Sequence, residues 1–150
     1  MKDSHSFEPR KRARRRALQA IYQWQITAQD ATDILRQFRA AQDMSGVDEG
    51  HFEKLLRGVS SRQEELDQAL QPYLDRPFDQ VDQMESVVLR IGAYELLHCP
   101  EMPFRVVLDE CVDLAHRFGS EKGHAFVNAV LDRAARQWRL QEIGKTTKRD

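Results

Sequence analysis

Apolar residues recur along most of this chain at intervals of three and four positions, which is the spacing of one face of an α-helix. The pattern is clearest over residues 104–118, where one apolar stripe runs from Phe104 to Phe118. Gly119 then provides a helix stop, and Ser120 is expected to cap the next helix. No segment of useful length alternates apolar and polar residues in the manner of a β-strand. The pattern therefore predicts an all-α protein.

Six helices are predicted, three on each side of a link at residues 72–81 that contains two prolines. Asp30 and Asp48 are expected to cap the second and third helices, because aspartate accepts hydrogen bonds from free backbone N–H groups. The fourth helix is apolar on more than one side, so we expect it to be central and buried. The predicted helices span residues 10–28, 31–42, 49–71, 82–97, 104–118 and 121–138.

These helices are expected to form one domain over residues 10–138, with subdomains at about 10–71 and 82–138. A chain of 150 residues buries roughly 68–70% of its unfolded surface, so it needs no disulfide or metal to hold its core. Residues 1–9 are predicted to be disordered, and the polar tail at 139–150 is predicted to be flexible.

The segment from Arg10 to Trp24 combines a dense run of cations with an apolar helical pattern. Its six cations spread around most of a helix circumference, so we expect this end of the helix to project from the body. An anchored helix with a basic end suits a polyanion, and nucleic acid is the best candidate. The alternative is a solvated and frayed N-terminus. If about five phosphates are neutralised, log K should fall with log salt at a slope near −3.5.

The net charge of −1 hides an asymmetry along the chain. Residues 1–16 carry seven Lys and Arg against two acids, so the remainder is acidic overall. A basic end on an acidic body implies a directed partner rather than general adhesion to polyanions. The two cysteines, the absence of a signal-like start and the lack of a long apolar run favour a reduced, cytoplasmic protein with no membrane span.

Catalytic and metal-binding patterns are weak. His98, Cys99, Cys111 and His116 fall within nineteen residues, but they lack the short paired spacing of zinc ligands, and Cys111 lies on an apolar helical stripe. Neither a nucleophile-elbow motif nor a glycine-rich phosphate loop is present. A solvated acidic face explains the carboxylates of residues 109–113. We therefore predict no enzymatic activity, no metal and no cofactor.

Two aromatic residues stand at the edges of apolar stripes. Phe126 lies about 100° from the centre of its stripe, with Asn128 on the other side. Its ring packs under the preceding helix or offers a flat surface for an unstacked base. Lys122 precedes it near the helix start, where backbone N–H groups favour phosphate. Tyr22 occupies a similar edge position beside the cations.

The chain resembles the NusB family of bacterial transcription antitermination factors from Arg12 to about Ala135. Its most specific segments are RARRRALQAIYQWQ at 12–25, ESVVLRIGAYEL at 85–96 and PFRVVLDECVDLAHRFGSEKGHAFVNAVLD at 103–132. The resemblance implies six or seven helices arranged as two three-helix bundles sharing a core. It also implies a non-enzymatic RNA-binding role.

The family pairs with NusE, a small-subunit ribosomal protein, and the pair binds single-stranded boxA RNA of rRNA operons within the RNA polymerase antitermination complex. The resemblance implies partner contacts on the side of Glu85, Phe104 and Val106. Lys122 stands where the family pattern leads us to expect an acidic residue, and a cation there should strengthen phosphate contact. The RNA-binding residues it implies, with Lys122 added from its position, are Arg12, Arg14, Arg15, Arg16, Tyr22, Lys122, Phe126 and Asn128.

Three alternatives are considered, and the sequence argues against the first, a standalone methyltransferase. Related domains occur fused to rRNA cytosine methyltransferases, but the chain ends about twelve residues after the sixth helix and shows no α/β cofactor pattern. Residues 117–134 fit a helix-turn-helix that binds duplex DNA. A helical module that contacts only proteins, with arginines that aid solubility, is the third. The sequence leaves the oligomeric state and the exact RNA preference open.

Overall fold

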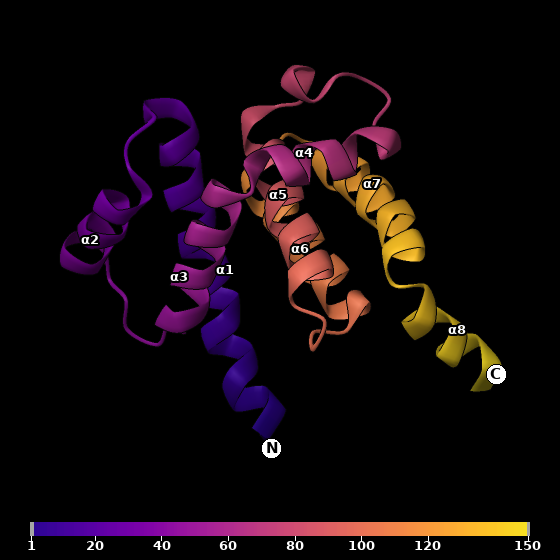
Figure 1. The fold of residues 1–150 in the computed structure, drawn as a ribbon. Coiled ribbons are helices and arrows are strands. Elements are labelled where there is room, and N and C mark those ends of the chain that lie inside the picture. The colour runs from indigo at the N-terminus through magenta and orange to yellow at the C-terminus, as the bar shows by residue number, and fades with distance from the viewer. Residues whose placement is uncertain (1, 150) are drawn as a thin grey trace. The chain divides into compact units, whose positions relative to one another are not determined.

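The computed structural model describes the backbone of residues 2–149 and the side chains of residues 7–144. This part of the chain is all-α and contains no strand, as predicted (Figure 1). It holds eight α-helices and two short 3₁₀ helices, where six or seven helices were expected. The helices are α1 Lys2–Thr27, α2 Ala31–Ala41, α3 Glu49–Ser61, α4 Gln63–Leu70, η1 Gln71–Tyr73, η2 Phe78–Gln80, α5 Gln83–His98, α6 Phe104–Phe118, α7 Gly123–Trp138 and α8 Leu140–Arg149.

The first compact unit contains α1, α2 and α3, each of which contacts the other two. The predicted caps are confirmed: Asp30 accepts a hydrogen bond from the Thr32 N–H at 2.8 Å, and Asp48 accepts one from the His51 N–H at 3.0 Å. Apolar residues spaced by three or four positions are buried on all three helices. They include Leu18, Ile21, Ile34, Leu35, Phe38, Phe52, Leu55, Leu56 and Val59.

Helix α1 begins at Lys2, well before the predicted start at residue 10. Pro9 stands immediately before that predicted start, and the helix continues through it. A proline removes one backbone hydrogen bond, and this helix is long enough to tolerate that loss. The tail likewise contains α8, where irregular chain was expected. The disorder predicted for 1–9 and the flexibility predicted for 139–150 stay predictions.

The third predicted helix is divided at Arg62 into α3 and α4, so the single helix expected over 49–71 is wrong. Neither glycine nor proline marks this break, and the Arg62 N–H donates to the carbonyls of Gly58 and Val59. The chain also divides into its two compact units here, between Gln63 and Glu64. Helix α4 therefore belongs to the second unit, and the 72–81 link lies inside that unit.

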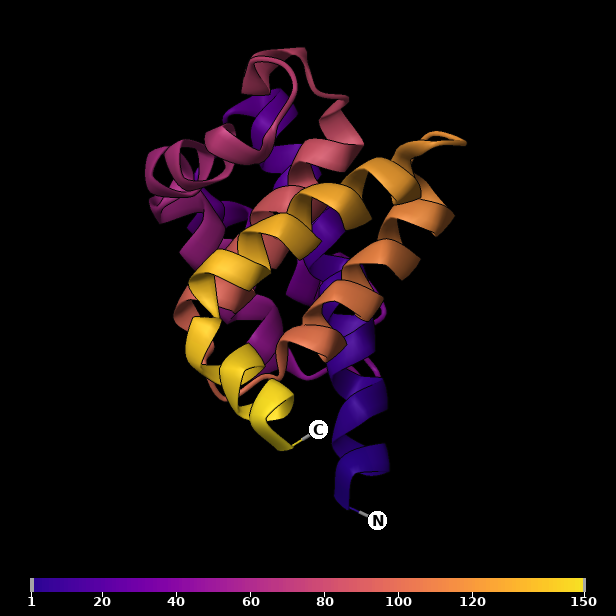
Figure 2. The same cartoon turned by 90° about the vertical axis from the view of Figure 1, so that its right-hand side faces the viewer.

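Helix α5 is the centre of the second unit, and every residue from Glu85 to Leu96 is buried, as its all-round apolar pattern predicts. Helices α6 and α7 both contact α5 and run alongside each other (Figure 2). Gly92 makes the close approach to α7 possible, because a Cβ at this position would lie 2.6 Å from a Leu131 methyl carbon.

The buried Arg139 joins several segments of the second unit. Its guanidinium donates to the carbonyls of Glu95, Leu96, Cys99 and Met102, at 2.8 to 3.2 Å, and to the Glu142 carboxylate at 2.6 Å. Leu96 lies in the last turn of α5, where carbonyl groups lack N–H partners from the helix, whereas the Glu95 and Cys99 carbonyls also accept backbone N–H groups, from Cys99 and Met102. Glu142 in turn accepts the Phe104 N–H at 3.0 Å, at the first residue of α6.

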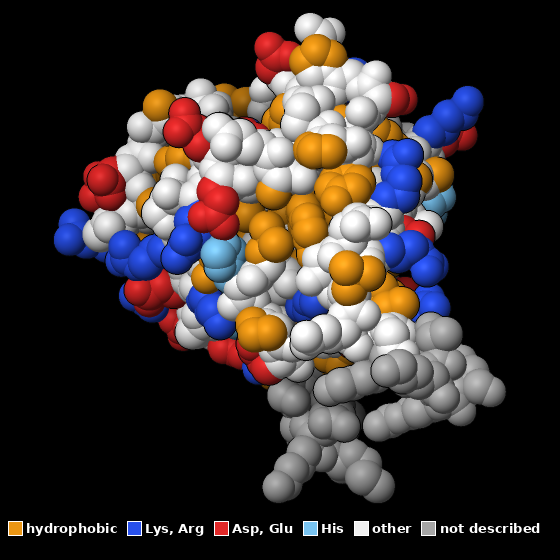
Figure 3. Space-filling view, turned by 45° about the vertical axis from the view of Figure 1, so that its right-hand side comes forward, with side chains coloured by type: hydrophobic (Ala, Val, Ile, Leu, Met, Phe, Trp, Pro, Cys, Tyr) orange, Lys and Arg blue, Asp and Glu red, His pale blue; other side chains and the backbone are white. Residues whose placement is uncertain are grey.

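Some apolar side chains remain at the surface. Phe118 was expected on the buried stripe of its helix, but its exposed fraction is 37%; it lies in the last turn of α6, where His116 and Arg117 are exposed as well. Ile26 and Leu140 are more exposed still. In the view of Figure 3 apolar side chains stand among charged ones, which is ordinary for a folded protein. Among the described residues, none of the helices combines the length and apolarity that a bilayer span needs.

Replacing Arg139 with leucine should destabilise the protein by about 3 kcal/mol or more, because four carbonyl groups and the Glu142 carboxylate would each lose a hydrogen bond from the guanidinium at once. Denaturant unfolding measures this change. Arg136→Ala is the matched control, since this exposed arginine pairs with Asp132 at 3.0 Å and its replacement should cost at most about 0.5 kcal/mol. Equal losses for both variants would contradict a structural role for Arg139.

Candidate nucleic-acid interface

The cations at the start of α1 are not equivalent. Arg12 is exposed and Arg15 and Arg16 are half-buried, but Arg14 is only 2% exposed. The prediction that this whole basic end projects from the body is therefore wrong for Arg14. Residues 14, 18 and 21 follow helical spacing, so Arg14 continues the apolar stripe of Leu18 and Ile21. Its long aliphatic stem allows an arginine to take such a position.

The loop between α2 and α3, residues 42–48, is docked along the basic segment of α1. The Asp48 N–H donates to the Pro9 carbonyl at 3.0 Å, and the Arg10 guanidinium lies 3.7 Å from the Asp48 carboxylate. One turn and a half further on, Arg16 donates to the Asp43 carbonyl from Nε and Nη2, at 3.1 and 2.9 Å. Part of the basic segment therefore holds this loop in place.

Gly46 lets the loop approach the Arg12 side chain closely. Its φ of +71° is a left-handed conformation that favours glycine. A Cβ at this position would lie 2.1 Å from Nη1 of Arg12. Any larger residue would displace the Arg12 guanidinium as well as strain the backbone.

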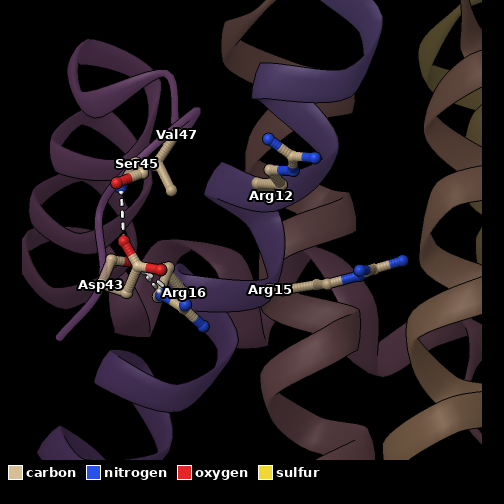
Figure 4. Close-up of a pocket in the computed structure, with 6 residues that line it drawn as sticks. All are labelled: Arg12, Arg15, Arg16, Asp43, Ser45 and Val47. Carbon is tan, nitrogen blue, oxygen red and sulfur yellow. Dashed lines mark hydrogen bonds between the residues drawn. The ribbon is translucent and has the colours of Figure 1, made fainter.

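Helix α1 and this loop enclose a pocket of about 370 Å³, lined by Arg12, Arg15, Arg16, Asp43, Ser45 and Val47. Figure 4 shows Arg16 directed toward Asp43, whereas Arg15 extends away from the loop. Nε of Arg15 is buried and has no hydrogen-bond partner within the described part of the chain. Three arginines and one carboxylate line the pocket, so it carries a positive charge suited to an anion.

Asp43 is held ionised by its surroundings. The Ser45 backbone N–H, which donates at 2.9 Å, the Ser45 side chain, and then Arg16 and Arg12 lower the pKa of this carboxyl below its ordinary value of 3.8. Because the folded-state pKa is depressed, the stabilisation is fully present above pH 3.8 and is lost as the pH falls through the lowered value. Asp43 is thus a fixed negative charge at neutral pH.

Tyr22 is half-buried, as an edge position predicts. It lies seven residues after Arg15, or about two helical turns, so the two side chains emerge from the same side of α1. An aromatic ring on the face that carries the pocket arginine can stack with an unpaired base.

Three more predicted RNA-binding residues lie on α7 or at its start. Lys122 is exposed and occupies the N-cap position, where no side chain caps the helix. Phe126, one turn later, is half-buried, and the guanidinium of Arg76 lies 4.7 Å from its ring centroid. Asn128 is exposed but lies about 200° around the helix from Phe126. The structure thus groups Lys122 with Phe126 and leaves Asn128 on another side of α7.

Glu85, predicted on the partner side, is only 6% exposed. Its carboxylate accepts hydrogen bonds from the Ser120 N–H at 3.1 Å and hydroxyl at 2.6 Å. Ser120 was expected to cap α7, and this prediction is wrong, because its hydroxyl is directed to Glu85 and Lys122 is the N-cap. A Cβ at Gly123 would lie 2.1 Å from Oε2 of Glu85, so the carboxylate fills the space beside the α6–α7 turn.

The other two residues predicted on the partner side begin α6. Phe104 is 7% exposed, and Val106 is half-buried. The hydrogen bond from the Phe104 N–H to Glu142 fixes this helix start. Of the three predicted partner contacts, Val106 therefore offers the most accessible side chain.

The residues considered as metal ligands have other surroundings. Nε2 of His98 lies 2.6 Å from the Glu65 carboxylate, and Cys99 and Cys111 are buried free thiols. No group of three or more metal-ligating side chains is assembled among the described residues.

Comparison with known proteins gives one consistent match. The model of the NusB family matches residues 11–136. The transcription antitermination protein NusB of Nitrosococcus oceani is 52% identical over 134 residues, covering 89% of this chain and 90% of that protein. The protein of the same name from Xanthomonas campestris pv. campestris is 53% identical over 135 residues, covering 90% of this chain and 85% of the relative.

Solved structures agree with this match. NusB of T. maritima superimposes with a TM-score of 0.75 at 27% identity, covering 85% of this chain and 91% of that one. A structure of the antitermination factors NusB and NusE in complex with dsRNA gives a TM-score of 0.77 at 24% identity, covering 85% and 96%. The second likeness concerns the fold.

The substitution Gly46→Ala should destabilise the protein by about 1–2 kcal/mol, because alanine resists the left-handed conformation and would displace Arg12. Gly50→Ala is the control: its Cβ would make an ordinary 3.6 Å contact in the first turn of α3, and helix propensity favours alanine by up to about 1 kcal/mol. Urea unfolding compares the two. A Gly46→Ala protein as stable as the Gly50→Ala protein would contradict the close approach.

Proposed function

Because the chain belongs to the NusB family of transcription antitermination proteins, we propose that it is an RNA-binding antitermination factor. With NusE, a small-subunit ribosomal protein, it binds the boxA element of rRNA operons and supports processive transcription by RNA polymerase. The observation that carries the RNA-binding role is the pocket formed by Arg12, Arg15 and Arg16. The protein acts in the cytoplasm by binding, without catalysis.

The pocket arginines supply affinity for phosphate. A planar guanidinium donates two parallel hydrogen bonds to phosphate oxygens, and three such groups lie around one cavity. Arg14 is assigned a different role: its buried position makes it part of the packing of α1. The phosphate contacts expected of four arginines are therefore reduced to three.

The second group of RNA contacts is Lys122 with Phe126. The start of α7 presents backbone N–H groups without a side-chain cap, and Lys122 adds a cation there, so a phosphate is favoured at this helix end. Phe126 and Tyr22 meet unstacked bases. Both the α1 pocket and the start of α7 are proposed to contact RNA. Asn128 contacts the same RNA as Phe126 only if the RNA wraps around α7.

The partner NusE is proposed to bind near the start of α6. Val106 is accessible there, whereas Glu85 and Phe104 act by fixing the α6–α7 turn and the helix start. Each unit is proposed to act as a three-helix bundle, made of α1, α2 and α3 in the first and α5, α6 and α7 in the second. The core shared between the two bundles stays a prediction.

The helix-turn-helix alternative uses α6, the turn at 119–122 and α7 to read duplex DNA. The direct test of the proposal is a titration with boxA RNA, scrambled RNA and duplex DNA, with and without NusE. We expect the tightest binding for boxA RNA in the presence of NusE. Preferred binding of duplex DNA would favour the helix-turn-helix, and no RNA binding even with NusE would favour a module that contacts only proteins.

Arg15→Ala should weaken boxA and scrambled RNA alike, by about tenfold, since a charged hydrogen bond to phosphate carries no base information. Fluorescence anisotropy measures both constants. Arg39→Ala is the control, because this arginine of α2 is paired with Glu49 and Glu53 outside the pocket. A loss confined to boxA RNA would contradict phosphate contact by Arg15.

Asp43→Asn should tighten RNA binding roughly threefold, because it removes the single carboxylate from the arginine pocket. Asparagine keeps the side-chain oxygen that accepts the Ser45 N–H, so the loop conformation is preserved. Asp33→Asn makes the same change of charge on an exposed site of α2 and controls for net charge. Equal tightening by both variants would show that the position of Asp43 does not matter.

A further inference from the structure

The loop between α4 and α5 places an arginine directly on Phe126. The guanidinium carbon of Arg76 lies 4.7 Å from the centroid of the Phe126 ring, within the range of a cation–π contact. Asp75 accepts hydrogen bonds from Nε and Nη2 of the same arginine, at 2.7 and 3.2 Å. One face of the guanidinium thus lies on a ring and one edge on a carboxylate.

The backbone around Arg76 is held in place by contacts of other residues in its loop. The Gln71 side chain donates to the Arg76 carbonyl at 3.0 Å and accepts the Phe78 N–H at 3.1 Å, bridging both sides of the arginine. Before it, the Tyr73 ring meets the edge of Trp138, with centroids 5.8 Å apart. After it, Phe78 lies 4.7 Å from the Arg90 guanidinium. The loop is therefore anchored on both sides of Arg76.

The contacts of Arg76 leave its outer face open. Its side chain is 43% exposed although one face rests on Phe126 and the Nε edge is paired. A guanidinium is planar, and bases of single-stranded RNA stack on such planes as they do on aromatic rings. The guanidinium of Arg76 therefore offers a flat surface that rests on the Phe126 ring and is oriented by the Asp75 carboxylate.

We propose that a base of single-stranded RNA stacks on the outer face of Arg76, with Phe126 as the backing that positions the guanidinium. This inference rests on the RNA-binding function proposed above and assigns a base-binding subsite to the loop at 71–80. It changes the role of Phe126, whose ring acts through Arg76 rather than as the outermost stacking surface.

The charges around Arg76 distinguish a base from a phosphate. The hydrogen bond that Arg76 donates to Asp75, together with the charges of Asp75 and Glu85, raises the pKa of Arg76, and Arg76 lowers the pKa of Asp75. Both groups are therefore ionised, and the Arg76–Asp75 pair carries no net charge. A phosphate approaching Arg76 would also meet the Asp75 carboxylate, whereas the neutral face of a base would not. The pocket on α1, with three arginines against one carboxylate, has the opposite balance.

The test compares Arg76→Ala, Arg76→Lys and Phe126→Ala in binding of single-stranded boxA RNA by the full chain with NusE. Stacking on one base corresponds to a loss of roughly 5- to 150-fold. We expect such a loss for both Arg76 variants, because lysine keeps the charge but has no plane, and we expect no change in the salt slope. The double variant, which carries both Phe126→Ala and Arg76→Ala, should bind RNA with an affinity no lower than that of the weaker-binding single variant, since the two groups act as one unit.

RNAs with a single abasic nucleotide complete the test. An RNA that lacks the base at the position proposed to stack on Arg76 should bind the unaltered chain and the Arg76→Ala variant with equal affinity. Arg136→Ala, another exposed arginine paired with an aspartate, is the matched control, and circular dichroism confirms that each variant is folded. Binding by Arg76→Lys equal to that of the unaltered chain, or a salt slope that falls by about 0.7 in Arg76→Ala, would replace base stacking by a phosphate contact.

Two further outcomes separate this inference from the proposed function. Unaltered binding by Arg76→Ala, in a chain that binds boxA RNA normally, would overturn the inference and leave the function standing. Absence of RNA binding by the unaltered chain with NusE would overturn both together.

Discussion

Repulsion among six cations within seven residues of one helix is the constraint on which the N-terminal unit depends. Like charges at helical spacing destabilise a helix, so the chain must give these side chains separate surroundings. Arg14 is buried on the core side, Arg10 meets Asp48, and Arg16 donates to a loop carbonyl. Fewer cations line the pocket than the sequence suggests, but their arrangement is fixed.

The sequence predicted the helices well where local chemistry determines them. Asp30 and Asp48 cap the helices they were assigned to, and the all-round apolar pattern of α5 corresponds to burial from Glu85 to Leu96. The break at Arg62 was missed because neither glycine nor proline marks it. The part played by Arg139 could not be predicted either, because the carbonyl groups it contacts lie about 40 residues earlier in the chain.

The candidate site was predicted in composition but not in arrangement. The cations, Tyr22 and Phe126 are recognisable from spacing and from the family resemblance, whereas the burial of Arg14 depends on tertiary packing. Asp43 lines the pocket, and Gly46 lies against Arg12, only because their loop folds back onto α1. Arg76 lies in a link with two prolines and has no periodic pattern, so only the structure brings it to Phe126. The arginines of this chain are thus proposed to have three roles: packing for Arg14, phosphate contact for the pocket arginines and base stacking for Arg76.

The central claim is that RNA affinity comes mainly from phosphate contacts by Arg12, Arg15, Arg16 and Lys122. The salt dependence of RNA binding by the unaltered chain tests it most directly. Four contacts at roughly −0.7 each predict a slope of log K against log salt near −2.8. This value is lower in magnitude than the one expected from the sequence, because Arg14 is buried. A slope close to zero would contradict the account.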